Sequence, residues 1–154
     1  MNLALIGCGN VGRAFVELLE ARRRQFPFRI TGIQTRRRTE IVGDEVARID
    51  DIGEFLERSQ AEIAVEITPL NPLDGEPAIA HIRSAFAHGI HVVTANKGPV
   101  AFAFRDLQNE ANRAGVMFRH ESTVMDGAPV FNLHRELLTG VEVLAFEGCL
   151  NSTS

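Results

Sequence analysis

Several features that often mark a protein class are missing from this sequence. Its 154 residues include no Trp, no Tyr and only two cysteines, Cys8 and Cys149, which are too few for the disulfide framework of a small secreted domain. No apolar run approaches the ~20 residues that span a bilayer. No charged leader with a long apolar region precedes the first strand-like run, as a secretory signal would require. These absences predict a reduced, cytoplasmic protein that does not cross a membrane.

A surplus of basic residues is also missing. The chain has 16 Lys and Arg against 20 Asp and Glu, a net charge of −4, whereas a general nucleic-acid binder carries a basic excess. The arginines that are present gather in two triplets, Arg22–Arg24 and Arg36–Arg38. The first triplet falls in the last turn of a predicted helix, where cations complement the helix dipole. The second triplet has no such explanation and leaves a local anion site open.

Apolar runs and helical periodicity alternate along nearly the whole chain. Strands are predicted over residues 3–6, 28–35, 61–67, 91–94, 116–121 and 141–146. Helices are predicted over residues 11–24, 52–59, 77–87, 104–114 and 129–138, with Asp50 or Asp51 capping the second. A strand–helix alternation of this kind predicts a doubly wound α/β fold of Rossmann type, with a mainly parallel sheet between two layers of helices.

A glycine-rich loop, Gly7-Cys8-Gly9-Asn10-Val11-Gly12, joins the first predicted strand to the first helix. The three glycines permit a tight turn, close approach of the backbone to a pyrophosphate, and close packing of the helix on the strand. The N-terminus of the helix then offers free N–H groups and a partial positive charge to the phosphates. The loop predicts dinucleotide binding through Gly7, Gly9, Asn10, Val11 and Gly12. The alternative is a glycine-rich turn that binds nothing.

The choice of dinucleotide is usually made at the end of the second strand, where an acidic residue holds the ribose hydroxyls of NAD. This sequence has Gln34 and Thr35 there, followed by Arg36 and Arg37, and no carboxylate. A guanidinium pairs with a 2′-phosphate through two parallel hydrogen bonds. The residues therefore predict NADP over NAD, with Arg36 and Arg37 as its contacts. The alternative is that these arginines are exposed loop charges.

Lys97 follows the predicted strand at residues 91–94, within a turn that contains glycine and proline. Parallel sheets place ligands at the carboxyl ends of their strands. A lysine at that position could bind the cofactor, hold a carboxylate or exchange a proton. An exposed loop lysine without a function is the other interpretation.

At this point the sequence resembles homoserine dehydrogenase, in blocks that follow the family's order along the whole chain. The blocks are Ile6-Gly7-Cys8-Gly9-Asn10-Val11-Gly12, Val65-Glu66-Ile67-Thr68-Pro69, Val92-Val93-Thr94-Ala95-Asn96-Lys97-Gly98-Pro99, Glu121-Ser122-Thr123-Val124-Met125-Asp126-Gly127-Ala128-Pro129 and Gly148-Cys149-Leu150-Asn151-Ser152-Thr153. The blocks around Lys97 and Glu121 are far more specific than the glycine loop.

The resemblance implies an NAD(P)-dependent oxidoreductase that interconverts L-homoserine and L-aspartate 4-semialdehyde, on the route to threonine, methionine and isoleucine. It implies that Lys97 is a catalytic and cofactor-binding lysine and that Thr68 lies near the nicotinamide. It also implies a monovalent cation, usually sodium, held by oxygens of Glu121, Val124, Asp126 and Ala128. Such oxygens, mostly from the backbone, suit a hard cation.

The resemblance also divides the chain. Residues 1–135 correspond to the NAD(P)-binding domain, and residues 136–154 to the start of a connection to the family's substrate-binding and dimerisation domain. We therefore expect the chain to bind cofactor and to turn over little homoserine by itself. The full-length family is expected to form a homodimer and to act on a small-molecule substrate, without nucleic acid. A non-catalytic nucleotide-binding or regulatory module is the alternative function.

Overall fold

The computed structural model describes residues 1–42 and 44–148. Its strands are β1 (Asn2–Ile6), β2 (Arg29–Gln34), β3 (Thr39–Ile41), β4 (Asp44–Val46), β5 (Ile63–Glu66), β6 (His91–Thr94) and β7 (Phe118–Arg119). Its helices are α1 (Asn10–Ala21), α2 (Ile52–Arg58), α3 (Ala78–Ala87), α4 (Lys97–Ala114) and the short α5 (Val130–Asn132). Two further helical turns are η1 (Glu121–Thr123) and η2 (Leu133–Leu137).

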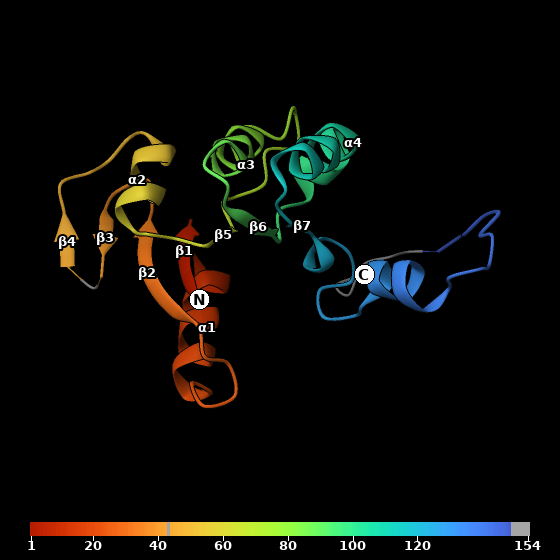
Figure 1. Ribbon diagram of the computed structural model, residues 1–154, viewed down its shortest axis with the longest axis horizontal. Helices are drawn as coiled ribbons and strands as arrows, with labels where there is room; N and C mark the ends of the chain where they lie inside the picture. The colour runs from red at the N-terminus through yellow and green to blue at the C-terminus, as the bar shows by residue number, and fades with distance from the viewer. Residues whose placement is uncertain (43, 149–154) are drawn as a thin grey trace.

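The described strands form one sheet in the order β4-β3-β2-β1-β5-β6-β7. β2, β1, β5, β6 and β7 are parallel, whereas β3 and β4 are antiparallel at one edge. In Figure 1, α2, α3 and α4 lie on one face of the sheet and α1 lies on the other. The predicted doubly wound, mainly parallel α/β fold is therefore confirmed. The winding reverses between β1 and β5, and such a reversal opens a crevice at the strands' carboxyl ends.

Two helices begin where a side chain supplies the missing acceptor for their first N–H groups. Asp51 caps α2, since its Oδ1 accepts from the Glu54 N–H at 2.7 Å. Asn96 caps α4 in the same way, accepting from the Gly98 N–H at 3.0 Å. The prediction that this helix begins at residue 104 is wrong by about two turns. The cap and the tolerance of proline in a first turn allow an earlier start, and a kink at Ala103 (φ −139°) separates the two segments.

The strands differ from the prediction at two places. The hairpin of β3 and β4 was not predicted, because residues 35–51 offered no apolar run long enough to indicate strands. The strand predicted over residues 141–146 is wrong, since these residues have no regular structure. A strand needs a neighbour that accepts its backbone hydrogen bonds, and no described strand lies beside this segment. Val141, Leu144 and Phe146 are accordingly exposed.

The main core lies between the sheet and the layer formed by α2, α3 and α4. Its largest fully buried side chains include Phe55 and Leu56 of α2, Ile82 of α3 and Leu107 of α4. They pack against the β-strand residues Ala4, Ile6, Ala64, Val92 and Phe118. Burying side chains of this size contributes roughly 1.5–3 kcal/mol each. This core holds the strand ends that form the site.

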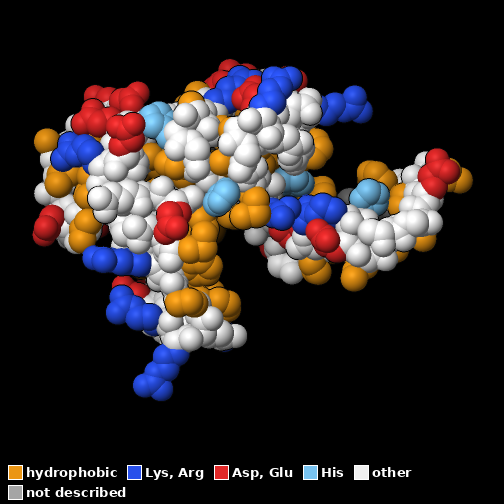
Figure 2. Space-filling view, in the orientation of Figure 1, with side chains coloured by type: hydrophobic (Ala, Val, Ile, Leu, Met, Phe, Trp, Pro, Cys, Tyr) orange, Lys and Arg blue, Asp and Glu red, His pale blue; other side chains and the backbone are white. Residues whose placement is uncertain are grey.

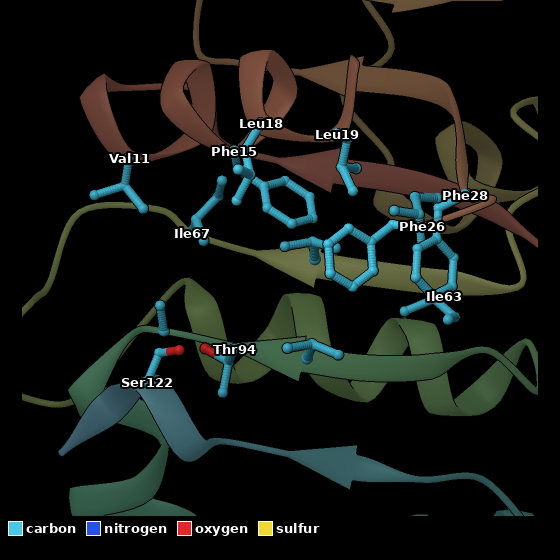
Figure 3. A pocket seen from close by; sticks show the side chains of 14 residues that line it. Val11, Phe15, Leu18, Leu19, Phe26, Phe28, Ile63, Ile67, Thr94 and Ser122 are labelled. Atoms are coloured by element: carbon cyan, nitrogen blue, oxygen red, sulfur yellow. The ribbon is translucent and has the colours of Figure 1, made fainter. Parts of the chain in front are cut away.

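The face that carries α1 is less completely covered. A pocket of about 390 Å³ lies there beside β5 and β6, and Figure 3 shows Phe15, Phe26 and Phe28 among its lining side chains. In the space-filling view hydrophobic side chains form a strip along α1 (Figure 2).

None of the helices in residues 1–42 and 44–148 combines the length and the hydropathy needed to cross a bilayer.

Candidate functional site

A second, more polar pocket of about 630 Å³ opens where the carboxyl ends of β1, β2 and β5 meet. Its lining comes from the glycine loop and the start of α1, the turn after β2, the segment leading into α2, the loop after β5 and helix α3. The residues are Ile6, Gly7, Cys8, Gly9, Arg13, Gln34, Thr35, Arg36, Arg37, Arg38, Arg48, Asp50, Ile52, Thr68, Pro69, Pro77 and His81. The pocket therefore occupies the crevice where the sheet reverses its winding, which is where open α/β sheets bind their ligands.

The glycine loop is held tightly on one side and is open on the other. Gly7 has φ +96°, and a methyl group on it would lie 2.7 Å from the Ile67 carbonyl oxygen. A methyl group on Gly12 would lie 2.9 Å from the Ile67 side chain. At Gly9, by contrast, a methyl group would meet no described atom within 4 Å. Gly7 and Gly12 thus serve the fold, whereas Gly9 leaves open space in which a ligand can approach the backbone.

The N-terminus of α1 faces this opening without a side-chain cap, because the residue before it is Gly9. The first N–H groups of the helix, at Asn10, Val11 and Gly12, have no acceptor within the helix. They are therefore the groups that suit a pyrophosphate. The Asn10 side chain accepts from Arg13 at 2.7 Å. The Val11 side chain lies in the apolar pocket on the other face, so Val11 can meet a nucleotide in the polar pocket only through its backbone.

The turn after β2 is shaped by Thr35. Its hydroxyl oxygen accepts from the N–H groups of Arg37 (3.2 Å) and Arg38 (3.1 Å), and its own N–H donates to the Arg38 carbonyl at 2.9 Å. The tight turn presents the exposed side chains of Arg36 and Arg37 on the rim of the polar pocket. Gln34 beside it is buried and donates to the Ile49 carbonyl at 2.6 Å.

The arginines around the pocket differ in whether a carboxylate already neutralises them. Arg38 pairs with Glu40 at 2.9 Å, and Arg48 pairs with Asp50 at 2.6 Å. Among the ion pairs of the described residues, none involves Arg36 or Arg37. Two guanidinium groups are therefore free to meet an anion at the end of β2.

Thr68 and Lys97 belong to two neighbouring strand ends that the structure joins. The Asn96 side chain donates to the Thr68 carbonyl at 3.2 Å, and Asn96 directly precedes Lys97. Thr68 lines the polar pocket. Lys97 is the first residue of α4 and is exposed, rather than lying in a turn as predicted. Its ammonium group is thus accessible from the carboxyl edge of the sheet.

Four residues of this region were not singled out as site residues from the sequence. Arg13, Arg48 and His81 line the polar pocket, and Glu66 lies beneath Thr68. His81 sits on α3, where burial lowers its pKa against the opposing influence of Glu66 and Glu76. The position of Arg13 one residue after the glycine pattern is a signal that could have been used. Arg48 lies in the segment before α2 and His81 on α3, and the sequence does not reveal that these elements meet at the pocket.

The four residues that the resemblance assigns to a cation site lie in one loop after β7, near the end of β6. They are Glu121, Val124, Asp126 and Ala128. The Glu121 carboxylate accepts from the N–H groups of Phe131 (2.9 Å) and Asn132 (3.2 Å), so it caps α5. The Ala128 carbonyl accepts from Val130 at 2.8 Å. Within the described residues no cluster of three or more His, Cys, Asp or Glu side chains is placed to hold a metal. A cation here would depend on backbone carbonyls.

His120, at the start of this loop, is packed among three aromatic rings. The ring centroids of Phe131, Phe104 and Phe118 lie 4.5, 5.1 and 5.4 Å away. Burial lowers the pKa of His120; the neighbouring Glu121 opposes this shift, whereas Arg135 adds to it. In the unfolded chain the imidazole returns to an ordinary pKa near 6.5.

We expect this histidine to make the fold less stable in acid. Below about pH 6.5 the His120 imidazole is protonated in the unfolded chain but not yet in the folded chain. The free energy of unfolding therefore falls as the pH is lowered toward the depressed pKa. His81 contributes in the same direction. Thermal midpoints measured from about pH 7.5 to about pH 5 should therefore fall, and fall less in His120→Phe, which keeps the aromatic packing. Equal slopes for the two proteins would contradict this assignment.

The geometry of the polar pocket defines a class of protein. A glycine loop with an open backbone position, an uncapped helix N-terminus and free guanidinium groups meet at the reversal of a doubly wound sheet. This is the arrangement of a dinucleotide-binding domain.

The comparisons then give the family. Residues 7–121 match the family model described as "Homoserine dehydrogenase, NAD binding domain". The chain is 45% identical over 112 residues to homoserine dehydrogenase of Methanocaldococcus jannaschii, covering 73% of this chain and 32% of that protein. It is 34% identical over 180 residues to the NAD(+)-dependent homoserine dehydrogenase of Pseudomonas canavaninivorans, covering 99% and 51%. The chain belongs to the homoserine dehydrogenase family.

A solved structure agrees with this assignment. A hyperthermophilic archaeal homoserine dehydrogenase mutant in complex with NADPH superimposes with a TM-score of 0.78 at 28% identity, over 90% of this chain and 49% of that one. The chain therefore spans about half the length of that structure, and about half or less of the curated relatives named above.

Proposed function

We propose that this chain binds NADP as the cofactor domain of a homoserine dehydrogenase. The observation that carries the proposal is the pair of unneutralised guanidinium groups, Arg36 and Arg37, at the end of β2. A 2′-phosphate there would gain two charge-assisted partners, whereas the ribose hydroxyls of NAD would find Gln34 in place of a carboxylate. One relative is named NAD(+)-dependent and one structural neighbour holds NADPH, so both dinucleotides occur among the similar proteins.

The polar pocket has features that suit each part of NADP. The open space at Gly9 and the uncapped start of α1 suit the pyrophosphate, and the turn at residues 35–38, the arginine turn, suits the adenosine end. The other half of the dinucleotide then extends toward β5 and β6, past Thr68 and toward Lys97. When bound, the nicotinamide supplies the hydride acceptor or donor.

We propose L-homoserine and L-aspartate 4-semialdehyde as the substrate pair of the whole enzyme. Oxidation of the alcohol transfers a hydride from its carbinol carbon to the nicotinamide and releases the hydroxyl proton, forming the C=O bond of the aldehyde. We assign to Lys97 the uptake or return of that proton, or the orientation of the substrate. Its exposure at the end of β6 leaves room for a substrate beside the cofactor.

The loop at residues 121–128 is the proposed site of a monovalent cation, sodium by resemblance. Glu121, Val124, Asp126 and Ala128 fall within this single loop, close to the end of β6. Residues 1–135 form the proposed cofactor domain, and residues 136–154 the proposed start of the connection to the remainder of the relatives' length. Residues 149–154, including Cys149, lie outside the described residues. Homodimerisation stays a prediction of the resemblance.

Titration of the 154-residue chain with NADPH, NADH and homoserine tests the proposal. A ligand raises the thermal midpoint only if it binds the folded state. At a concentration of 100 times its dissociation constant, it adds about 2.7 kcal/mol to the free energy of unfolding. We expect NADPH to raise the midpoint most, NADH less, and homoserine oxidation to be undetectable in the chain alone. Equal shifts with NADPH and NADH would contradict the NADP assignment, and no shift with either would exclude a dinucleotide function. Repeating the series with choline in place of sodium tests the cation.

A further inference from the structure

One charged side chain of the site region lies wholly inside the protein. Glu66, the last residue of β5, has 0% of its surface exposed. Burying a carboxylate without partners costs several kcal/mol, so a buried one must be compensated by hydrogen bonds. The location is notable because β5 borders the crevice where the sheet reverses its winding.

Both oxygens of Glu66 are engaged, and the donors come from two neighbouring strand ends, the loop after β5 and the last residue of β6. Oε1 accepts from the Thr68 N–H at 2.9 Å and also from the Thr68 hydroxyl. Oε2 accepts from the hydroxyl of Thr94, the last residue of β6, at 2.7 Å. Three donors face the carboxyl group, which suits a carboxylate, since an ionised carboxyl is an acceptor only.

The same hydrogen bonds continue to the start of α4. The Thr94 hydroxyl oxygen accepts from the Asn96 N–H at 3.0 Å, and the Asn96 side chain donates to the Thr68 carbonyl at 3.2 Å. Asn96 also caps α4 through the Gly98 N–H at 3.0 Å. Lys97 therefore stands between two residues whose backbone positions this network fixes.

The network serves one end of the crevice only. The turn at residues 35–38 is built by Thr35 and receives none of the hydrogen bonds of Glu66, Thr68, Thr94 or Asn96. With the pyrophosphate at the glycine loop and the adenosine at the end of β2, the second half of a dinucleotide must extend toward β5 and β6.

We propose that Glu66 is a positioning residue that joins the loops after β5 and β6 into the surface that receives the nicotinamide half of the cofactor. It acts through Thr68, Thr94 and Asn96, and it sets the position from which Lys97 acts. This inference rests on the proposed function, because it requires that the chain bind a dinucleotide.

The test compares a whole dinucleotide with its adenosine half. Glu66→Gln keeps the size of the side chain but replaces one acceptor oxygen with an NH₂ group, which cannot accept from Thr68 or Thr94. Loss of one hydrogen bond to a charged group predicts about a tenfold weaker affinity for NADPH. The affinity for 2′,5′-ADP, which has no nicotinamide, should remain that of the wild type. If Glu66 served only the general stability of the fold, the variant would lose affinity for both ligands equally.

Thr94 provides a matched pair of variants that does not alter the buried charge. Thr94→Ser keeps the hydroxyl and should bind NADPH as the wild type does. Thr94→Val removes the hydroxyl and should weaken the affinity for NADPH but not for 2′,5′-ADP. If Glu66→Gln and Thr94→Val lost affinity for NADPH and 2′,5′-ADP equally, or lost none, the positioning role would be overturned. The proposal that the chain binds a dinucleotide would stand. If the wild type bound neither ligand, the proposed function itself would be overturned, and this inference with it.

Discussion

Replacing Gly7 with alanine is expected to lower the free energy of unfolding by about 3 kcal/mol and to abolish NADPH binding. The residue has φ +96°, where a side chain is strained, and the added methyl group would lie 2.7 Å from the Ile67 carbonyl oxygen and 3.0 Å from the Thr68 nitrogen. Both contacts are with backbone atoms of the β5 loop, which cannot rotate away. A chain of this size should lose roughly 6–12 °C of thermal midpoint.

Gly9→Ala is the matched control, since the same methyl group is added two residues later. Gly9 has φ −81° and ψ −151°, and its methyl group would meet no described atom within 4 Å. Its unfolding free energy should stay within about 0.5 kcal/mol of the wild type. NADPH binding should nevertheless be lost, because the methyl group occupies the space of the approaching pyrophosphate. Unfolding curves and NADPH titrations of both variants decide the matter, and similar stability losses in the two would refute the division of roles.

The second large effect concerns the choice of cofactor. The double change Arg36→Ala and Arg37→Ala should weaken NADPH about 100-fold, the equivalent of ~2.7 kcal/mol, because hydrogen bonds to charged groups contribute about 1.5–3 kcal/mol each. NADH lacks the 2′-phosphate and should change by less than about threefold. Both dissociation constants can be measured by fluorescence or calorimetric titration at fixed ionic strength, since salt screens exposed charges.

Arg22→Ala with Arg23→Ala removes the same charge at the other end of α1, away from the polar pocket. These arginines follow the C-terminus of α1, whose N-terminus faces the polar pocket, and both are exposed. This control separates a local 2′-phosphate site from a general effect of net charge, and it should leave the NADPH affinity close to that of the wild type. If the Arg36 and Arg37 variant weakened NADPH and NADH by the same factor, the 2′-phosphate assignment would be wrong.

Much of the fold could be predicted because its signals are local. The alternation of apolar runs with helical periodicity gave the doubly wound sheet, and Asp51 was among the predicted caps. The hairpin of β3 and β4 was missed because three-residue strands carry too little pattern. The strand expected at residues 141–146 was wrong for a different reason. A suitable composition is not sufficient when no described strand is beside the segment to pair with it.

The site could be predicted where a residue type at a fixed spacing has one physical purpose. The glycine loop and the arginine turn are of this kind, because each lies next to a strand end in the chain itself. Glu66 stands out in the sequence only as part of a family block, because Thr94, which donates to its carboxylate, is 28 positions away. Arg48 and His81 likewise reach the pocket through tertiary contacts. Long-range partners of this kind cannot be inferred from periodicity.

The central position of β1 has a consequence for how the chain is made. β1 precedes both of its neighbours in sequence, and its register pairs Leu3 with Ile30 on one side and with Ile63 on the other. Because parallel neighbours require long crossover segments, the contacts of this strand are non-local, and non-local pairing is slow. During synthesis the strand must therefore remain open along one edge until β5 has left the ribosome. The cofactor crevice, which lies between those two strands, can form only after that step.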